Sequence, residues 1–253
     1  MNPELISVRE SDNNIVKLEC YNRLDSTTKL ARAYACDGYP DRYAVIAEYL
    51  GNSDERGIHM SMILRPSIFP SQAGLLSSLA TVALVSALEE HTTKKLGIGW
   101  VSNVFCEGRQ VGSVSIEGKL DNFTSYEYII VTFSVMLSDE DFPPRMSDLI
   151  KKVFSSENNT IASIIARNII SKFFPLYSSL KVPDKFMTLY MQKFILTGTK
   201  VKLLKDGKKQ TRKVLGVNPQ TCALLLEGPG KTVDAITSPT SVLIPKTVKI
   251  GKK

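Results

Sequence analysis

The chain has 253 residues and a mass of 28.0 kDa, which is long for one compact domain and sufficient for a large domain with a small one. Hydrophobic residues make up 43% of the chain and the mean hydropathy is -0.03, which excludes a mainly disordered protein. No apolar run reaches the length of a membrane span, and residues 1–12 carry acids without an apolar stretch, so we expect a soluble cytoplasmic protein.

The net charge of +7 is concentrated at the C-terminal end. Residues 198–253 contain 12 Lys and Arg against 3 Asp and Glu, which leaves 20 basic and 22 acidic residues before them. This change predicts a boundary near Thr197, between a domain of residues 1–197 and one of residues 198–253. A basic surface attracts nucleic acid, acidic proteins or other anions. Because the basic segment has no aromatic residue for base stacking, we interpret it as the solvated face of a small β-domain, with nucleic-acid binding as the alternative.

The hydrophobic pattern of the first 197 residues predicts strands that alternate with helices. In chain order, it predicts a strand at residues 15–21, a helix at 29–35, strands at 43–50 and 58–65, and a helix at 71–90. It then predicts a hairpin of strands 97–106 and 110–118, a central strand at 126–137, and helices at 147–154 and 161–174. Asp25 or Ser26 can cap the first helix, and Glu107-Gly108 can form the hairpin turn.

Beyond Gly198, the chain has the pattern of a small β-barrel. Short apolar runs, each followed by turn residues, lie at 201–204, 213–217, 223–226 and 241–244. Strands of four or five residues at this spacing are typical of small barrels. The predicted fold class is therefore α+β, with a mixed β-sheet and flanking helices followed by a small SH3-like β-barrel.

The cysteines do not predict a metal site. They are far apart and form no Cys-x-x-Cys pair, at Cys20, Cys36, Cys106 and Cys222. A zinc site needs clustered ligands, and only His59 and His91 could add imidazole nitrogens. We therefore expect buried, reduced thiols.

A series of motifs in a fixed order resembles the biotin–protein ligase family. The matching segments are Leu24-Asp25-Ser26-Thr27, residues 45–49, 60–66, 111–117, 198–202 and 223–226, together with Trp100. The resemblance, to a divergent member, covers nearly the whole chain and begins almost at Met1, so we expect no counterpart of the N-terminal DNA-binding domain that some members have. It implies a biotin/lipoate ligase-like catalytic domain followed by the family's C-terminal barrel.

The resemblance also implies an activity. Members of the family join biotin to ATP, with Mg, and pass the biotinyl group from biotinyl-AMP to a lysine of a biotin carboxyl-carrier domain. Biotin, ATP and that carrier domain are therefore the expected ligands and partner, unless the protein uses none of them. Association through the edges of the sheet would give a homodimer, and neither a membrane nor nucleic acid is an expected partner. The reaction requires groups that hold phosphates, a lysine that neutralises the developing charge, and an apolar slot for the ring.

Ligand-binding residues follow from the resemblance, position by position. Ser26 and Thr27 stand where the family's ring-binding hydroxyls lie, although both residue types also serve as helix caps. Trp100 and Asn103 fall in the segment that matches the family's Lys-Trp-Pro-Asn-Asp box. Trp100 would pack on the adenylate or, alternatively, in the core. Gly112 lies at the start of the strand that follows.

The loop that holds the phosphates in the family is reduced in this chain. The family has a Gly-Arg-Gly-Arg loop after Glu48-Tyr49, whereas this chain has a segment several residues shorter with one arginine, Arg56. Asp54 and Glu55 add carboxylates that would repel a phosphate. Arg56 is either a remnant of the loop or one half of an Arg–Glu surface pair on a tight turn.

Gln110 stands at the position of the family's catalytic lysine. An amide can donate a hydrogen bond but carries no charge, and losing one preorganised charged donor costs about 3 kcal/mol, or about a hundredfold in rate. Arg109 is adjacent, but alternation along a strand predicts that it faces away. Residues 134–136 replace a Gly-Ile-Asn motif that lines the family's nucleotide site.

Three hypotheses follow. The first is an active ligase with Gln110 in place of the lysine. The second is a catalytically impaired relative that binds a ligand or a carrier protein without efficient chemistry. The third is a lipoyl- or octanoyl-type acyltransferase with Cys106 as its nucleophile, for which His59 and His91 are the available bases.

Overall fold

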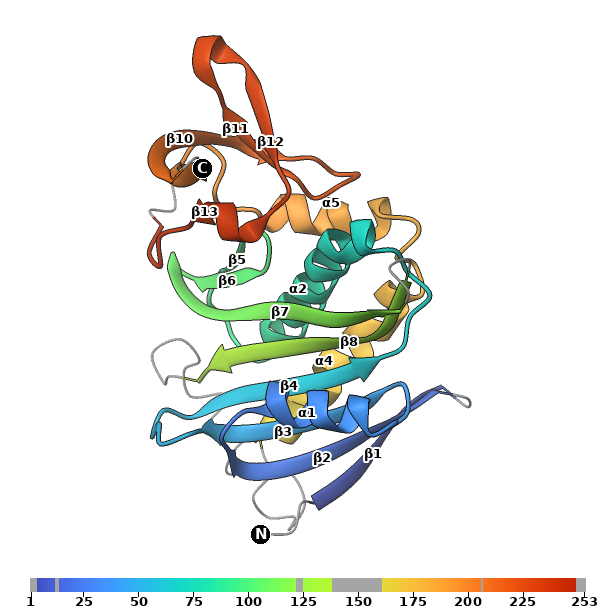
Figure 1. Ribbon diagram of the computed structural model, residues 1–253. Helices are drawn as coiled ribbons and strands as arrows, with labels where there is room; N and C mark the ends of the chain where they lie inside the picture. The colour runs from blue at the N-terminus through green and yellow to red at the C-terminus, as the bar shows by residue number, and fades with distance from the viewer. Residues whose placement is uncertain (1–3, 12–13, 122–124, 138–160, 206, 249–253) are drawn as a thin grey trace.

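The computed structural model describes residues 4–11, 14–121, 125–137, 161–205 and 207–248. The helix predicted at residues 147–154 lies outside these ranges. Within them, the chain forms a large β-sheet with helices on both faces and a smaller β-sheet at one end (Figure 1).

The large sheet has eight strands in the order β1-β2-β3-β4-β8-β7-β6-β5. Its strands are β1 (Glu4–Ser11), β2 (Asn14–Leu24), β3 (Tyr43–Leu50), β4 (Gly57–Leu64), β5 (Leu96–Gly99), β6 (Asn103–Cys106), β7 (Arg109–Asp121) and β8 (Ser125–Met136). Neighbouring strands are antiparallel, except that β2 and β3 are parallel. Parallel neighbours need a crossover connection, and α1 (Thr27–Cys36) provides it.

The helices cover the two faces of this sheet unequally. Helices α2 (Ala73–Glu89), α4 (Ile161–Tyr177) and α5 (Asp184–Lys193) contribute to one extensive hydrophobic core. Helix α1 lies on the opposite face (Figure 1), where Ala31 and Ala35 pack against a smaller cluster of sheet residues. The part of that face beyond α1 is therefore left for polar side chains.

The smaller sheet has five strands in the order β12-β11-β10-β9-β13, the arrangement of an SH3-like unit. Its strands are β9 (Lys200–Lys205), β10 (Lys208–Val217), β11 (Leu224–Glu227), β12 (Val233–Ile236) and β13 (Val242–Leu243). Buried residues of this sheet belong to the same hydrophobic core as the helices of the large one. The composition break near Thr197 thus lies between α5 and β9, and the division into domains 1–197 and 198–253 stays a prediction.

The predicted fold class is confirmed, with four local differences, one of which is that β12 has no counterpart among the predicted barrel strands. The single strand predicted at residues 97–106 is wrong, because the chain turns at 100–102 and forms two short strands, β5 and β6. Strand β1 and helix α5 have no counterpart in the prediction from sequence.

The expectation that no apolar run is long enough to span a membrane is also wrong. The segment Pro70–Glu89 has the length and apolar composition of a spanning helix. However, 67% of its apolar window is buried inside the protein, which is the behaviour of a core helix.

Candidate functional site

Two adjacent rows of polar side chains cross the centre of the large sheet on the face that carries α1. We call them the polar platform: one row is Ser61, Thr132 and Ser115, and the other is His59, Ser134, Ser113 and Asn103. Cross-strand partners share a face of a sheet, so each row presents its side chains to the same side. Ser115 is exposed and Ser113 and Ser134 are half-buried, so part of the platform is accessible to a ligand.

The N-terminus of α1 meets one end of the platform. The Ser26 hydroxyl accepts a hydrogen bond from the Lys29 backbone N–H at 3.2 Å, which confirms the helix cap. Thr27 is 1% exposed, and its hydroxyl accepts from Ser61 with 2.9 Å between the oxygens. Thr28, which sequence reasoning missed, lies 3.0 Å from Thr132 through its Oγ1. Helix and sheet thus share one cluster of hydroxyls.

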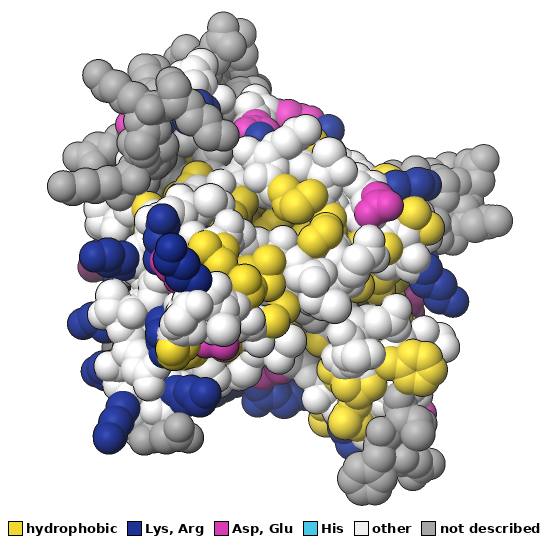
Figure 2. All heavy atoms as spheres, turned by 90° about the horizontal axis from the view of Figure 1, so that it is seen from above, with side chains coloured by type: hydrophobic (Ala, Val, Ile, Leu, Met, Phe, Trp, Pro, Cys, Tyr) yellow, Lys and Arg dark blue, Asp and Glu magenta, His cyan; other side chains and the backbone are white. Residues whose placement is uncertain are grey.

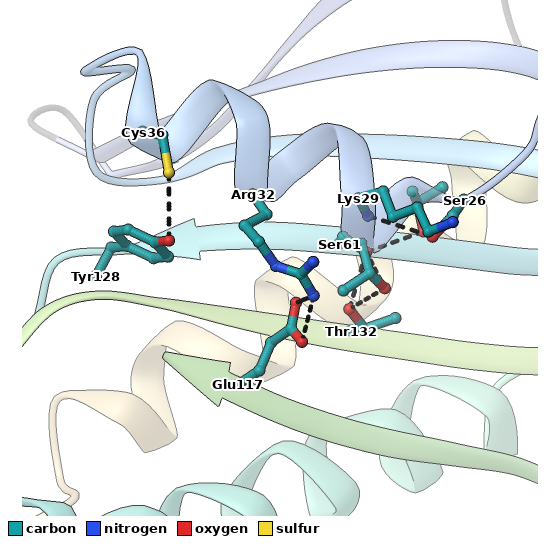
Figure 3. Close-up of polar contacts among 10 residues, drawn as sticks. Ser26, Lys29, Arg32, Cys36, Ser61, Glu117, Tyr128 and Thr132 are labelled. Atoms are coloured by element: carbon teal, nitrogen blue, oxygen red, sulfur yellow. Dashed lines mark hydrogen bonds and ion pairs between the residues drawn. The ribbon is translucent and has the colours of Figure 1, made fainter. Parts of the chain in front are cut away.

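Figure 3 shows this boundary of the platform beneath α1. Arg32 of α1 forms a bidentate ion pair with Glu117 of β7, with both Nη2–carboxylate distances at 2.6 Å. Further along the helix, Cys36 lies 3.4 Å from the Tyr128 hydroxyl. These contacts fix α1 over β8 and β7 and leave the rows beyond its N-terminus uncovered by that helix.

His59 belongs to the second row, where burial favours its neutral form. Its Nδ1 lies 2.8 Å from the Ser134 hydroxyl. Burial lowers the pKa of His59 below the usual 6.5, because removing water disfavours the imidazolium form. A neutral imidazole keeps one donor and one acceptor, so His59 adds a polar group to the platform without adding a charge.

A cavity of about 290 Å³ opens next to the second row. It is lined by Glu55, Arg56, Arg109, Gln110, Val111, Met136 and Leu137. The cavity brings together three segments that the resemblance assigns to the nucleotide: the reduced loop, the start of β7 and the end of β8. The sequence alone could not show that they enclose one space.

The charges that line this cavity differ from the expectation. Arg56 pairs with Glu48, at 2.9 and 3.0 Å to one carboxylate oxygen, but Glu48 is a buried residue of β3 and the pair does not lie on the surface of a tight turn. Arg109, which alternation predicts to face away, is among the residues that line the cavity with Gln110. Strand β7 has an extra residue, Val111, directly after Gln110, where its register with β6 shifts.

Gln110 is held in place on both sides. Its side-chain Nε2 donates to Asn103 Oδ1 at 3.1 Å, and Asn103 Nδ2 donates to the Trp100 carbonyl at 3.2 Å. The Gln110 backbone N–H donates to the Lys246 carbonyl at 2.9 Å. This chain of amides connects the cavity to the end of the polar platform.

Gly112 and Trp100 have packing roles in this conformation. A Cβ on Gly112 would lie 2.7 Å from the Ser134 carbonyl oxygen, so the close approach of β7 and β8 requires glycine. Trp100 is 3% exposed, and its Nε1 donates to the Cys222 carbonyl at 2.7 Å. The indole therefore joins the large sheet to the small one and is not presented to the cavity.

The reduced loop is fixed by a residue that sequence reasoning missed. Arg23 at the end of β2 donates to the carbonyls of Gly51 and Ser53, at 2.8 and 2.7 Å. Its guanidinium also lies 4.8 Å from the centre of the Tyr49 ring. The loop is thus held against β2, and the only local signal for this was an arginine at the end of a strand.

The candidate nucleophile is buried, and both candidate bases are engaged in hydrogen bonds. Cys106 is 1% exposed, while His59 and His91 are hydrogen-bonded to Ser134 and Asn168. Within the described parts of the chain, no three His, Cys, Asp or Glu residues are grouped as metal ligands.

Comparison with known proteins gives the family resemblance independent support. No protein family model matches the chain. The chain is 28% identical to the bifunctional ligase/repressor BirA of Bacillus subtilis (strain 168), over 138 residues, which are 50% of this chain and 42% of that protein. BirA of Bacillus spizizenii is 27% identical over the same lengths. The chain therefore spans about two fifths of the curated relatives that it matches.

Solved structures extend the likeness to almost the whole chain. The biotin protein ligase from Aquifex aeolicus in complex with biotin and ATP superposes with a TM-score of 0.65 and 18% identity, covering 89% of this chain and 97% of that one. A biotin protein ligase-like protein of unknown function from Silicibacter sp. TM1040 gives a TM-score of 0.63 and 15% identity, covering 88% and 94%. The chain resembles biotin protein ligases in sequence and has their fold. At these identities, the structural likeness establishes the biotin protein ligase fold alone.

Proposed function

We propose that this protein binds biotin along the polar platform and adenylates it slowly, as a biotin protein ligase with reduced phosphate-handling groups. The observation that carries the proposal is Gln110, held by Asn103 at the cavity where the three nucleotide-side segments meet. The similarity to BirA and the biotin protein ligase fold supply the expected reaction.

The platform has the chemistry that the ring end of biotin requires. A ureido ring offers two N–H donors and one carbonyl acceptor, and hydroxyls can serve both because each donates and accepts. The half-buried Thr28 and Thr132 form such a pair at the α1 end, with the fully buried Ser61 hydroxyl behind them. Met136 and Val111, at the cavity, supply apolar surface for the rest of the ligand.

The cavity has only part of the chemistry that adenylation requires. Joining a carboxylate to the α-phosphate brings negative charges together, and a fixed cation lowers that barrier. Arg56 is neutralised by Glu48, and the lysine position carries the uncharged Gln110. Arg109 is the other basic residue of the lining. Among those residues Glu55 is the one carboxylate, so Mg would arrive on the phosphates of ATP.

The experiment measures binding and chemistry separately. Calorimetry with biotin tests the platform, and labelled ATP with biotin measures the rate at which biotinyl-AMP forms. Added carrier domain then tests transfer, with BirA of B. subtilis as the reference. We expect biotin binding and an adenylation rate about a hundredfold below the reference. Absence of biotin binding would overturn the proposal, and a rate equal to the reference would overturn the claim of slow chemistry.

A second candidate function is a binding module without chemistry. The observation that favours it is the short loop, which Arg23 holds against β2 through two carbonyls. Because the loop is both short and held in place, few of its residues could close around a triphosphate. Biotin binding without any labelled adenylate, even at high protein concentration, would support this candidate. Unchanged acyl transfer after Cys106→Ser would eliminate the cysteine-based acyltransferase.

A further inference from the structure

The outer face of the β9–β10 hairpin carries a row of exposed lysines. We call it the lysine face, and its members are Lys200, Lys202, Lys209 and Lys213. In the pairing of β9 with β10, Lys200 lies opposite Lys213, Lys202 opposite Thr211, and Lys209 opposite Leu204. The residues that alternate with them, such as Val201 and Leu203, are buried in the core. The alternation therefore places all four ammonium groups on one surface.

This surface is unfavourable for the isolated protein. Like charges directly opposite each other in a sheet are destabilising, and Lys200 and Lys213 form such a pair. None of the four lysines forms an ion pair with another described residue. In Figure 2, Lys and Arg side chains gather along the left side of this end of the molecule, with hydrophobic side chains beside them. An anionic partner would relieve the repulsion.

The composition of the surface favours an acidic protein over a nucleic acid. Leu243 pairs with Lys202, so it shares the lysine face, and it is 44% exposed. Leu215 on β10 is 40% exposed. Exposed leucines beside charges suit a protein partner, because protein interfaces combine apolar contacts with a polar rim. Single-stranded nucleic acid would instead be bound by aromatic side chains, which residues 198–253 lack.

The lysine face is also connected to the candidate active site. After β13, the chain continues to Lys246, whose carbonyl accepts the Gln110 backbone N–H, and Val248 donates to the Gly108 carbonyl. Lys246 is three positions after Leu243, which is at most about 11 Å of extended chain. A protein bound at the lysine face thus lies beside the cavity where biotin would be activated.

We propose that the lysine face is the docking surface for the acidic protein that accepts the biotinyl group. Because this inference rests on the proposed function, its partner is a carboxyl-carrier domain with a negatively charged surface. The lysines attract that surface by charge, and Leu243 adds an apolar contact. Docking then brings the acceptor lysine to the edge of the cavity.

The test compares two double variants with the same change in charge. Lys202→Glu with Lys213→Glu alters the lysine face, whereas Lys181→Glu with Lys231→Glu alters exposed lysines elsewhere. Calorimetry measures the affinity of each for a carboxyl-carrier domain of net negative charge, in low and high salt. The measurement omits biotin and ATP, so failure of docking is distinguishable from failure of the proposed ligand site.

We expect the lysine-face variant to bind the carrier domain at least about tenfold more weakly at low salt. Its affinity for biotin, measured separately, should be unchanged. The control variant should lose less than about twofold in affinity for the carrier domain. Thermal unfolding of Lys213→Ala, which removes the opposed charge, is expected to shift to higher temperature. Equal losses in both double variants, or none, would overturn the proposal. The proposal would also be overturned if a DNA duplex bound through the same lysines and the carrier domain did not bind.

Discussion

Gln110 and Asn103 face each other across the β6–β7 hairpin and share a hydrogen bond of 3.1 Å between Nε2 and Oδ1. Asn103 is fixed in turn by the Trp100 carbonyl, so the acceptor at Oδ1 points toward position 110. A lysine at position 110 could donate to the same oxygen and would bring a positive charge to the cavity. Position 110 is therefore where a substitution can test whether an added charge changes the chemistry of the cavity.

Gln110→Lys is expected to raise the rate of biotinyl-AMP formation by about a hundredfold, because one fixed charged donor stabilises the transition state by about 3 kcal/mol. Single-turnover assays with labelled ATP measure the rate, and calorimetry measures biotin affinity. Gln110→Met is the control, since it keeps the length of the side chain without a donor or a charge. If the lysine and methionine variants had the same rate, position 110 would have no role in charge stabilisation.

The local features of this site could be predicted from the sequence, whereas its charges could not. The Ser26 cap and the β6–β7 turn follow from short patterns of residues, and the structure has both. By contrast, Glu48 neutralises Arg56 and Arg23 fixes the loop through contacts that depend on the fold. A sequence position alone indicates a charge but not its partner.

The same distinction explains the differences in the fold. Strand β3 has the predicted bounds because its apolar run is buried on both faces. Helix α5 has only three buried apolar residues, Phe186, Met187 and Tyr190, which is too short a pattern to detect. Trp100 lies in a turn inside an apolar stretch, and its burial depends on Cys222, more than a hundred residues later.

Ser26 and Thr28 are expected to differ in what they contribute. Ser26→Ala removes the helix cap and should lower the free energy of unfolding by about 1 kcal/mol, with biotin affinity within about threefold. Thr28→Val removes a hydroxyl of the cluster with Thr132 and should weaken biotin binding by about tenfold. Urea unfolding and calorimetry provide the two measurements. A larger loss of affinity in Ser26→Ala would show that the cap residue binds the ring directly.

The lowered pKa of His59 predicts how the stability of the protein depends on pH. Its pKa is lowered in the folded protein by burial, while in the unfolded chain the imidazole takes up a proton near pH 6.5. The unfolded state therefore binds more protons below pH 6.5, so stability is complete above that pH and falls as the pH is lowered. Urea unfolding at pH 7.5, 6.5 and 5.5 measures the change.

His59→Asn, which can keep a hydrogen bond to Ser134, should reduce this loss of stability between pH 6.5 and 5.5. Burial also lowers the pKa of His91, so the remaining dependence should decrease further when His91 is replaced as well. A pH profile unchanged in His59→Asn would mean that other groups govern acid sensitivity.

Trp100 offers a test of whether the two sheets fold as one unit. It is the single tryptophan of the chain, and its indole N–H donates to Cys222 at the joint between the sheets. Because one hydrophobic core includes residues of both sheets, tryptophan fluorescence and far-UV circular dichroism should report the same unfolding midpoint. Trp100→Phe should lower stability by about 1–3 kcal/mol, since the buried Cys222 carbonyl loses its donor. Two separate midpoints in the native protein would instead support independent domains on either side of Thr197.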